Sequence, residues 1–200
     1  MKAKPTIRIT AAAVAVAFAG ALAFFPALPV LSQNSGANPS ATPNGATVVT
    51  PIAYVSLDQV PRGKTVDIAL VLNIAKGYHI NSHTPSQTYL IPTNVTLADT
   101  SGFQATGSNY PEGQTLKFAF SEDKLSVYSG TATIWLRFQA QNDAPQGEII
   151  LPLVVRFQAC NDTACLPPAK VAVPVHISIA TADTKTRPTH PEIFKNEPKI

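Results

Sequence analysis

Apolar residues recur at every second position in several stretches of the chain. The clearest stretch is 171–179, where valine and isoleucine alternate with polar or small residues. The same period of two is found over 66–74, 132–138 and 149–157. Such alternation predicts β-strands that bury one face and expose the other. Further strands are expected at 50–57, 88–98 and 115–128, and no stretch has a convincing helical period.

Turn signals rich in proline, glycine and aspartate separate these stretches, as at 61–63 and 143–147. Seven to nine short strands over 48–180 predict an all-β domain, specifically an immunoglobulin-like β-sandwich. Two sheets packed face to face would bury the apolar rows of all these strands. A closed barrel is the alternative architecture.

The first 32 residues have the pattern of an export signal. Three basic residues precede an uncharged apolar run over 10–25, and Pro26, Pro29 and small residues follow. We therefore expect residues 1–32 to be a cleaved signal peptide. The alternative is an uncleaved anchor over 9–31, which is long enough to span a bilayer, although its two prolines disfavour a helix there. Either arrangement exports the rest of the chain.

Two segments flank the predicted domain. Residues 33–47 are rich in Ser, Asn, Pro, Gly and Thr, a composition typical of a flexible linker. Residues 181–200 are polar and broken by prolines, so we expect a tail that is disordered or lies along the surface.

Charge and motifs exclude several functions. The net charge is +3, from 15 basic and 12 acidic residues, and Lys2, Lys4 and Arg8 of the leader account for all of it (15 − 3 = 12). A neutral exported domain argues against a nucleic-acid partner. The sequence contains no G-x-G-x-x-G, P-loop, HExxH or G-x-S-x-G motif, so nucleotide binding, zinc proteolysis and serine hydrolysis lose their usual support. No cofactor is expected.

The only two cysteines, Cys160 and Cys165, lie close together between two predicted strands. Four residues separate them, so both sulfurs fall at one turn, where a disulfide forms easily. Closing so short a loop stabilises a domain by roughly 2 kcal/mol in the chain-entropy account, which is little for a sandwich with its own core. A pair of this kind is suited to opening and closing without unfolding the domain.

Three roles for the pair stay open at this point. It is a redox-active dithiol–disulfide, a structural staple in an exported binding or adaptor domain, or part of a copper or zinc site in a metal chaperone. His79 and His83 lie in the segment 77–85, but their spacing relative to the cysteines matches no metal motif. We therefore expect no metal, and a His79 that is hydrogen-bonded to backbone at a strand edge.

Three stretches of the chain carry a resemblance to a known family. They are KGYHINSHTPSQTYLIPTNVTL at 76–97, KLSVYSGTATIWL at 124–136, and VRFQACNDTACLPP at 155–168. The last is the most specific, because it combines Gln158, the cysteine pair and Pro167-Pro168. The region 47–179 resembles the N-terminal domain of the DsbD thiol:disulfide interchange proteins.

The resemblance implies a periplasmic immunoglobulin-like domain whose Cys160–Cys165 pair cycles between dithiol and disulfide. The expected electron donor is a membrane-embedded thiol reductase. The expected acceptors are periplasmic thioredoxin-like proteins or disulfide isomerases, including factors of cytochrome c maturation. Two features differ from full-length members: nothing here resembles their membrane domain or thioredoxin-like domain, and some members have five residues between the cysteines. The donor is therefore expected to be a separate protein.

The resemblance also assigns roles to individual residues. It makes Cys165 the cysteine that meets the partner and Cys160 the one that resolves the mixed disulfide. A cap loop with an aromatic ring corresponds to 109–123, which makes Phe118 or Phe120 the candidate cap. The alternation of Leu116, Phe118 and Phe120 instead favours ordinary core residues of a strand. His79 and Asn81 match the segment near the cysteines, where they would orient a thiolate or serve the strand structurally. The tyrosines of these stretches are expected in the core or at its rim: Tyr78, Tyr89 and Tyr128.

Overall fold

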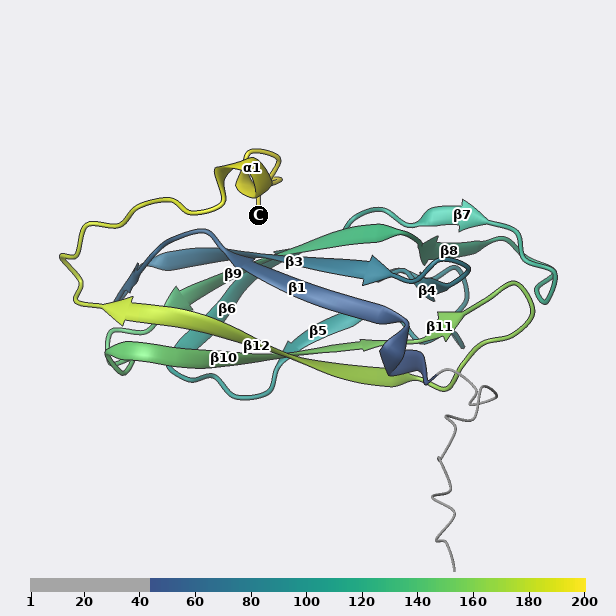
Figure 1. Cartoon of the computed structure of the whole chain (residues 1–200), viewed down its shortest axis with the longest axis horizontal. Helices are drawn as coiled ribbons and strands as arrows, with labels where there is room; N and C mark the ends of the chain where they lie inside the picture. The colour runs from purple at the N-terminus through teal and green to yellow at the C-terminus, as the bar shows by residue number, and fades with distance from the viewer. Residues whose placement is uncertain (1–43) are drawn as a thin grey trace, which may run out of the picture. The chain divides into compact units, whose positions relative to one another are not determined.

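The structure is a computed structural model that describes residues 44–200, and almost all of its regular structure is β (Figure 1). Two four-stranded sheets form its body. The first sheet has the order β1 (Val49–Val55), β3 (Thr65–Ile74), β9 (Thr131–Ala140), β6 (Phe103–Asn109). The second has the order β2 (Val60–Pro61), β12 (Ala169–Ala180), β10 (Gly147–Phe157), β5 (Asn94–Leu97). Every pairing in these two sheets is antiparallel except that of β2 with β12.

A third, smaller sheet lies at one end of the sandwich (Figure 1). We call it the small sheet; its order is β11 (Ala159–Cys160), β4 (His79–Asn81), β8 (Leu125–Tyr128), β7 (Gln114–Leu116). Only one residue separates β10 from β11, so the chain passes directly from the second main sheet into the small sheet. This connection positions Cys160.

The core between the main sheets is built by the alternating rows that the sequence shows. Their inward side chains are almost fully buried, and outward neighbours are mostly half-buried or exposed. The largest contributors are Ile68, Leu70, Leu72, Ile134, Leu151, Leu153 and Phe157. Burial of these rows removes large apolar areas from water, which drives the pairing of the sheets. The predicted all-β immunoglobulin-like sandwich is confirmed.

The strands differ from the expectation in number and position. The described residues form twelve strands, four of which have only two or three residues. The strand expected over 88–98 is limited to β5, and the one expected over 115–128 is a β7–β8 hairpin with a loop at 117–124. The polar edge strand β6 has no apolar alternation and was missed by the pattern.

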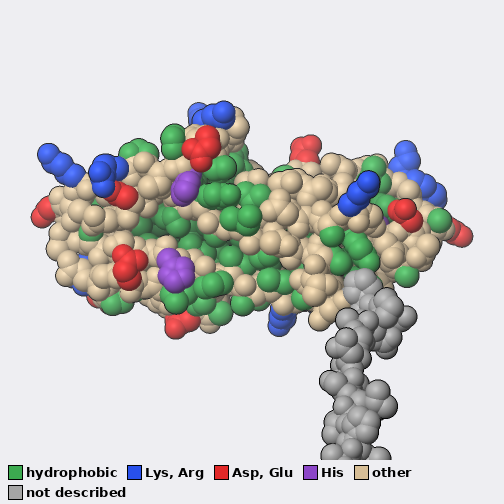
Figure 2. All heavy atoms as spheres, viewed as in Figure 1, with side chains coloured by type: hydrophobic (Ala, Val, Ile, Leu, Met, Phe, Trp, Pro, Cys, Tyr) green, Lys and Arg blue, Asp and Glu red, His purple; other side chains and the backbone are tan. Residues whose placement is uncertain are grey.

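One side of the sandwich is open between β1 and β12. A hollow of about 480 Å³ lies there, and apolar side chains gather over it in the face drawn in Figure 2. His176 and His190 both contribute to its lining. Within residues 44–200, no three residues of His, Cys, Asp or Glu come together as a metal site would require.

Residues 181–200 lie along the sandwich, the second of the two arrangements expected for this segment. Arg187 pairs with Asp58 at 2.9 Å, and the Thr189 hydroxyl donates a hydrogen bond to the carbonyl oxygen of Val55. The short helix α1 (Pro191–Phe194) lies over the first sheet, where Phe194 meets Trp135 edge-on.

Residues 1–43 fall outside the described part of the chain, and with them the predicted signal peptide and most of the predicted linker. The last residues of that linker form the 3-10 helix η1 (Gly45–Thr47), which Asn44 caps with its side chain. Between residues 44 and 200, no helix has the length and apolar character needed to cross a membrane.

Candidate functional site

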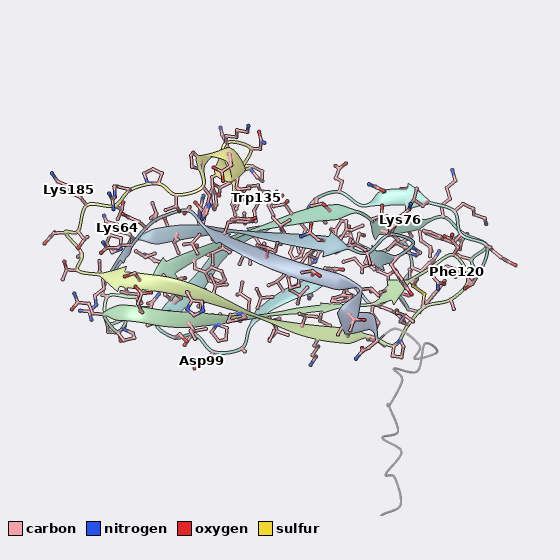
Figure 3. The ribbon with its side chains drawn as sticks, in the orientation of Figure 1. Lys64, Lys76, Asp99, Phe120, Trp135 and Lys185 are labelled. Carbon is pink, nitrogen blue, oxygen red and sulfur yellow. A yellow bond between two sulfur atoms is a disulfide. The ribbon has the colours of Figure 1, made fainter. Side chains whose placement is uncertain are left out.

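A disulfide joins Cys160 and Cys165 at the end of the sandwich that carries the small sheet (Figure 3). Their Cα atoms are 3.9 Å apart. The turn between them is held by Asn161, whose side-chain oxygen accepts hydrogen bonds from the amides of Thr163 and Ala164 and from the Thr163 hydroxyl. Such an Asx turn is a local structure that does not need the disulfide. Asparagine at the start of such a turn is a common signal in a sequence.

Two hydrogen bonds hold the chain in place where it leaves the turn at Leu166. The amide of Leu166 donates to the carbonyl of Ala159 at 2.8 Å, and the Gln158 side chain donates to the carbonyl of Leu166 at 3.3 Å. These bonds lie on both sides of the cysteine pair. The backbone around the sulfurs is therefore tied down independently of the bond between them.

The two cysteines occupy different environments. Cys160 is completely buried at the end of β11, whereas Cys165 is exposed. Thiol–disulfide exchange needs a direct approach of the attacking sulfur to one sulfur of the bond. Access therefore selects Cys165 as the atom that another molecule can reach.

Cys165 opens onto a hollow of about 500 Å³, which we call the Cys165 pocket. Apolar side chains and acidic side chains share its wall, and Tyr89 at its rim is 72% exposed. Figure 3 shows Phe120 beside the sulfur atoms at this end of the molecule. The lining residues are Tyr89, Leu90, Phe120, Ser121, Glu122, Asp123, Leu125, Gln158 and Cys165.

The loop 117–124 of the β7–β8 hairpin, which we call the aromatic loop, lines the Cys165 pocket through residues 120–123. Phe118 is buried and stacks on the ring of His79, with centroids 3.8 Å apart and planes 16° apart. Phe120 lies beyond Phe118 at 5.5 Å and is 36% exposed. The expectation that both belong to a core strand is wrong: Phe118 is buried, but from a loop.

His79 faces the cysteine pair from β4. It is 4% exposed and lies directly opposite Cys160 in the antiparallel pairing of β4 with β11. Burial holds the pKa of His79 below its usual value, while the negative charge of Asp162 acts in the opposite direction. Its Nε2 atom is buried without a hydrogen-bond partner among the described residues, so the expected hydrogen bond to backbone is absent for that atom.

Asn81 lies two residues after His79 on β4 and forms hydrogen bonds with the neighbouring segment. Its side-chain nitrogen donates to the carbonyl of Ile91 at 3.0 Å, and the Thr93 hydroxyl donates to the Asn81 carbonyl at 2.5 Å. These bonds join β4 to the segment that carries Tyr89. Asn81 is fully buried, and its side-chain oxygen has no partner among residues 44–200.

His83 lies in different surroundings from His79. Its ring stacks on Tyr110 at 3.7 Å, and its Nδ1 atom is 3.1 Å from the carbonyl oxygen of Thr93. The structure therefore gives the two histidines of the 77–85 segment separate neighbours.

The structure is an all-β sandwich with a short-range disulfide at one end, in which one cysteine is exposed and the other is buried. The match to a family is specific: the model of the family described as thiol:disulfide interchange protein DsbD, N-terminal, covers residues 47–176. The chain belongs to this family. No curated protein matches it in a sequence comparison.

Several solved structures are similar, among them the following three. The reduced N-terminal domain of DsbD from Neisseria meningitidis is 16% identical, with a TM-score of 0.40, over 71% of this chain and 90% of that one. The same bacterium's DsbD N-terminal domain in complex with the PilB N-terminal domain is 17% identical, with a TM-score of 0.38, over 69% and 88%. The N-terminal periplasmic domain of ScsB from Proteus mirabilis is 10% identical, with a TM-score of 0.42, over 63% of this chain and 45% of that one.

Proposed function

We propose that this protein is a periplasmic electron carrier that passes two electrons at a time through Cys160 and Cys165. The donor is a membrane-embedded thiol reductase, and the acceptors are thioredoxin-like proteins or disulfide isomerases that have their own disulfide. The observation that carries the proposal is the contrast within one bond: Cys165 is exposed and Cys160 is buried.

The reaction consists of two exchanges that conserve electrons. In the reduced carrier, the Cys165 thiolate attacks one sulfur of the acceptor's disulfide, and the acceptor's other sulfur leaves as a thiolate. Cys160 then loses its proton and attacks the Cys165 sulfur of the mixed disulfide. The acceptor leaves as a dithiol, and the carrier is left with the Cys160–Cys165 bond. The membrane reductase restores the dithiol by the reverse sequence.

The surroundings of the pair suit these exchanges. The Cys165 pocket offers room for a partner's chain beside the exposed sulfur, and the aromatic loop, which lines the pocket through Phe120, is the candidate cap. The Asx turn and the backbone bonds around Leu166 hold the turn when the disulfide is open. We therefore expect the domain to stay folded when the bond is open.

A structural role for the disulfide predicts different behaviour. A staple resists reduction until the potential falls below about −300 mV, whereas a carrier equilibrates with buffers near the glutathione potential. The test is to quantify free thiols of the full chain across such buffers. A bond that stays closed throughout would refute the electron-carrier function and leave an exported adaptor domain with a structural disulfide.

Trapping identifies the partners and assigns the cysteines. The Cys160→Ala variant keeps the exposed thiol and is expected to accumulate disulfide-linked partners in the periplasm. The Cys165→Ala variant keeps the buried thiol and is the matched control, which is expected to trap little. Equal trapping by both variants would contradict the assignment of Cys165 as the attacking residue.

A further inference from the structure

The resolving step leaves one chemical requirement unmet by the two cysteines themselves. Cys160 must give up its thiol proton before it attacks, and it must do so in a fully buried position. A thiol in apolar surroundings loses its proton reluctantly, because the thiolate is poorly solvated there. A nearby proton acceptor would remove this obstacle.

The pairing of β4 with β11 places His79 beside Cys160. Residues directly opposite in an antiparallel pair project to the same face of the sheet, with Cβ atoms about 4.5–5.5 Å apart. The two side chains are therefore neighbours. Cys165, in contrast, lies across the disulfide and toward solvent.

The imidazole of His79 has an unused nitrogen. Phe118 covers one face of the ring, the side chain is 4% exposed, and Nε2 has no hydrogen-bond partner among the described residues. An unpaired buried polar atom is costly and therefore calls for an explanation. In the oxidised form neither sulfur carries a proton, whereas reduction adds an S–H group to Cys160, the residue directly opposite His79 in the pairing of β4 with β11.

We propose that Nε2 of His79 accepts the thiol proton of Cys160 during resolution of the mixed disulfide. The proposal rests on the electron-carrier function and adds a proton acceptor to it. The proton moves from Cys160 to His79, the Cys160–Cys165 bond forms, and the bond from Cys165 to the partner breaks. The imidazolium then releases its proton to solvent.

The charges around His79 are compatible with this role. Burial lowers the pKa of His79, so the ring is neutral and has a free lone pair near pH 7. Asp162, on the turn after β11, raises the pKa of His79 through its negative charge, and it thereby stabilises the imidazolium. The aromatic loop contributes the exposed Lys117, Glu122, Asp123 and Lys124. Strand β8 contributes the phenol of Tyr128, which donates to the carbonyl of Pro111.

The test follows the two steps separately with dithiodipyridine, an uncharged disulfide, added in equimolar amount to the reduced full chain. The first thiopyridone is released when Cys165 attacks, and the second when Cys160 resolves the mixed disulfide. His79→Gln is expected to slow the second release by about a hundredfold near pH 7, the lower end of the typical range for general base catalysis. The rate of the first release should change little.

The pH profile distinguishes proton transfer from a structural role. With His79 present, the second rate should be nearly independent of pH between about 6.5 and 8, because the imidazole is already neutral and the thiol is still protonated. With His79→Gln, it should rise about tenfold per pH unit, because hydroxide must remove the proton. An unchanged rate and profile in the variant would overturn the proposal.

Two controls keep the outcome decisive. Absence of any second release from the wild-type protein would instead refute the electron-carrier function. Cys160→Ala, which lacks the resolving cysteine, is the control that should release only the first thiopyridone. If His79→Gln fails to fold, ¹⁵N NMR of the wild-type imidazoles decides. The His79 resonances should shift on reduction while those of His176, which is exposed on β12, stay unchanged; an unchanged His79 would overturn the proposal.

Discussion

The ring of Phe118 lies nearly parallel to the imidazole of His79, with centroids 3.8 Å apart. This contact joins the aromatic loop to β4 and thereby to the strand that ends in Cys160. Phe118 also belongs to a small cluster with Leu90 and Leu125, separate from the main core. Changes in the aromatic loop should therefore alter the reduction rate of the disulfide.

The first prediction concerns access to the disulfide. Phe118→Ala should lower the free energy of unfolding by about 3 kcal/mol, typical of truncating a buried phenylalanine. It should also speed reduction of the disulfide by dithiothreitol, because the loop loses its main contact. Phe120→Ala is the control: its ring is partly exposed, so the cost to stability should be much smaller. Equal reduction rates for Phe118→Ala and the wild type would refute the predicted role of the aromatic loop.

The second prediction concerns the charge of Asp162. Its negative charge raises the pKa of His79 against the larger effect of burial. Asp162→Asn should therefore lower the pKa of His79 further, as measured by NMR titration of the imidazole. The difference between variant and wild type should shrink as salt is added, because Asp162 is exposed and screened. A pKa of His79 that rises in the variant would contradict the assigned interaction.

The third prediction is a pH dependence of stability. The folded-state pKa of His79 lies below its unfolded value of about 6.5, so the unfolded chain binds a proton more readily. The contribution of neutral His79 is fully present above about pH 6.5 and is lost as the pH falls from there toward the folded-state pKa. Denaturant unfolding at several pH values should show this loss, and His79→Gln should remove it. A variant that loses as much stability as the wild type over this pH range would contradict it.

The fourth prediction concerns the segment 181–200. Arg137 on β9 binds the carboxylate of Asp67 through two nitrogens, and it also contacts Glu197 and the carbonyl of Ile200. Arg137→Gln removes these bonds and leaves two carboxylates close together, so the unfolding free energy should fall by about 1 kcal/mol.

The same substitution should speed amide hydrogen exchange in the last residues of the chain, around Glu197 and α1. Arg187→Gln, which breaks only the exposed pair with Asp58, is the control and should have less effect on stability. The rate of disulfide reduction should not change in either variant, since the described contacts of Arg137 lie on the first sheet and in the segment 181–200 rather than on the small sheet. A changed reduction rate would show coupling between the two regions.

The main strands could be predicted from the sequence because their two faces lie in different environments. Inward residues of β3 and β12 pack against the opposite sheet and outward residues meet water, so apolar residues recur at every second position. Strand β6 could not be found in this way: it lies at the edge of the first sheet and is mostly exposed. Its residues are placed by backbone hydrogen bonds to β9, which do not depend on side-chain type.

The candidate site was predictable only in part. The short spacing of Cys160 and Cys165 indicated a turn and an easy disulfide, but not which sulfur is exposed. Alternation of Phe118 and Phe120 predicted a strand, whereas the hairpin turns into a loop before them. The stacking partner of Phe118, His79, lies far away in sequence, and no local pattern encodes such a contact.

The separation of the small sheet from the far end of the sandwich has a practical use. Lys64 and Lys185 lie at the end opposite Phe120 and the sulfur atoms (Figure 3). A tether placed at either lysine would hold the molecule on an electrode with Cys165 turned toward the solution. Voltammetry on such a film could then read electron exchange from one oriented layer of molecules, without a soluble mediator.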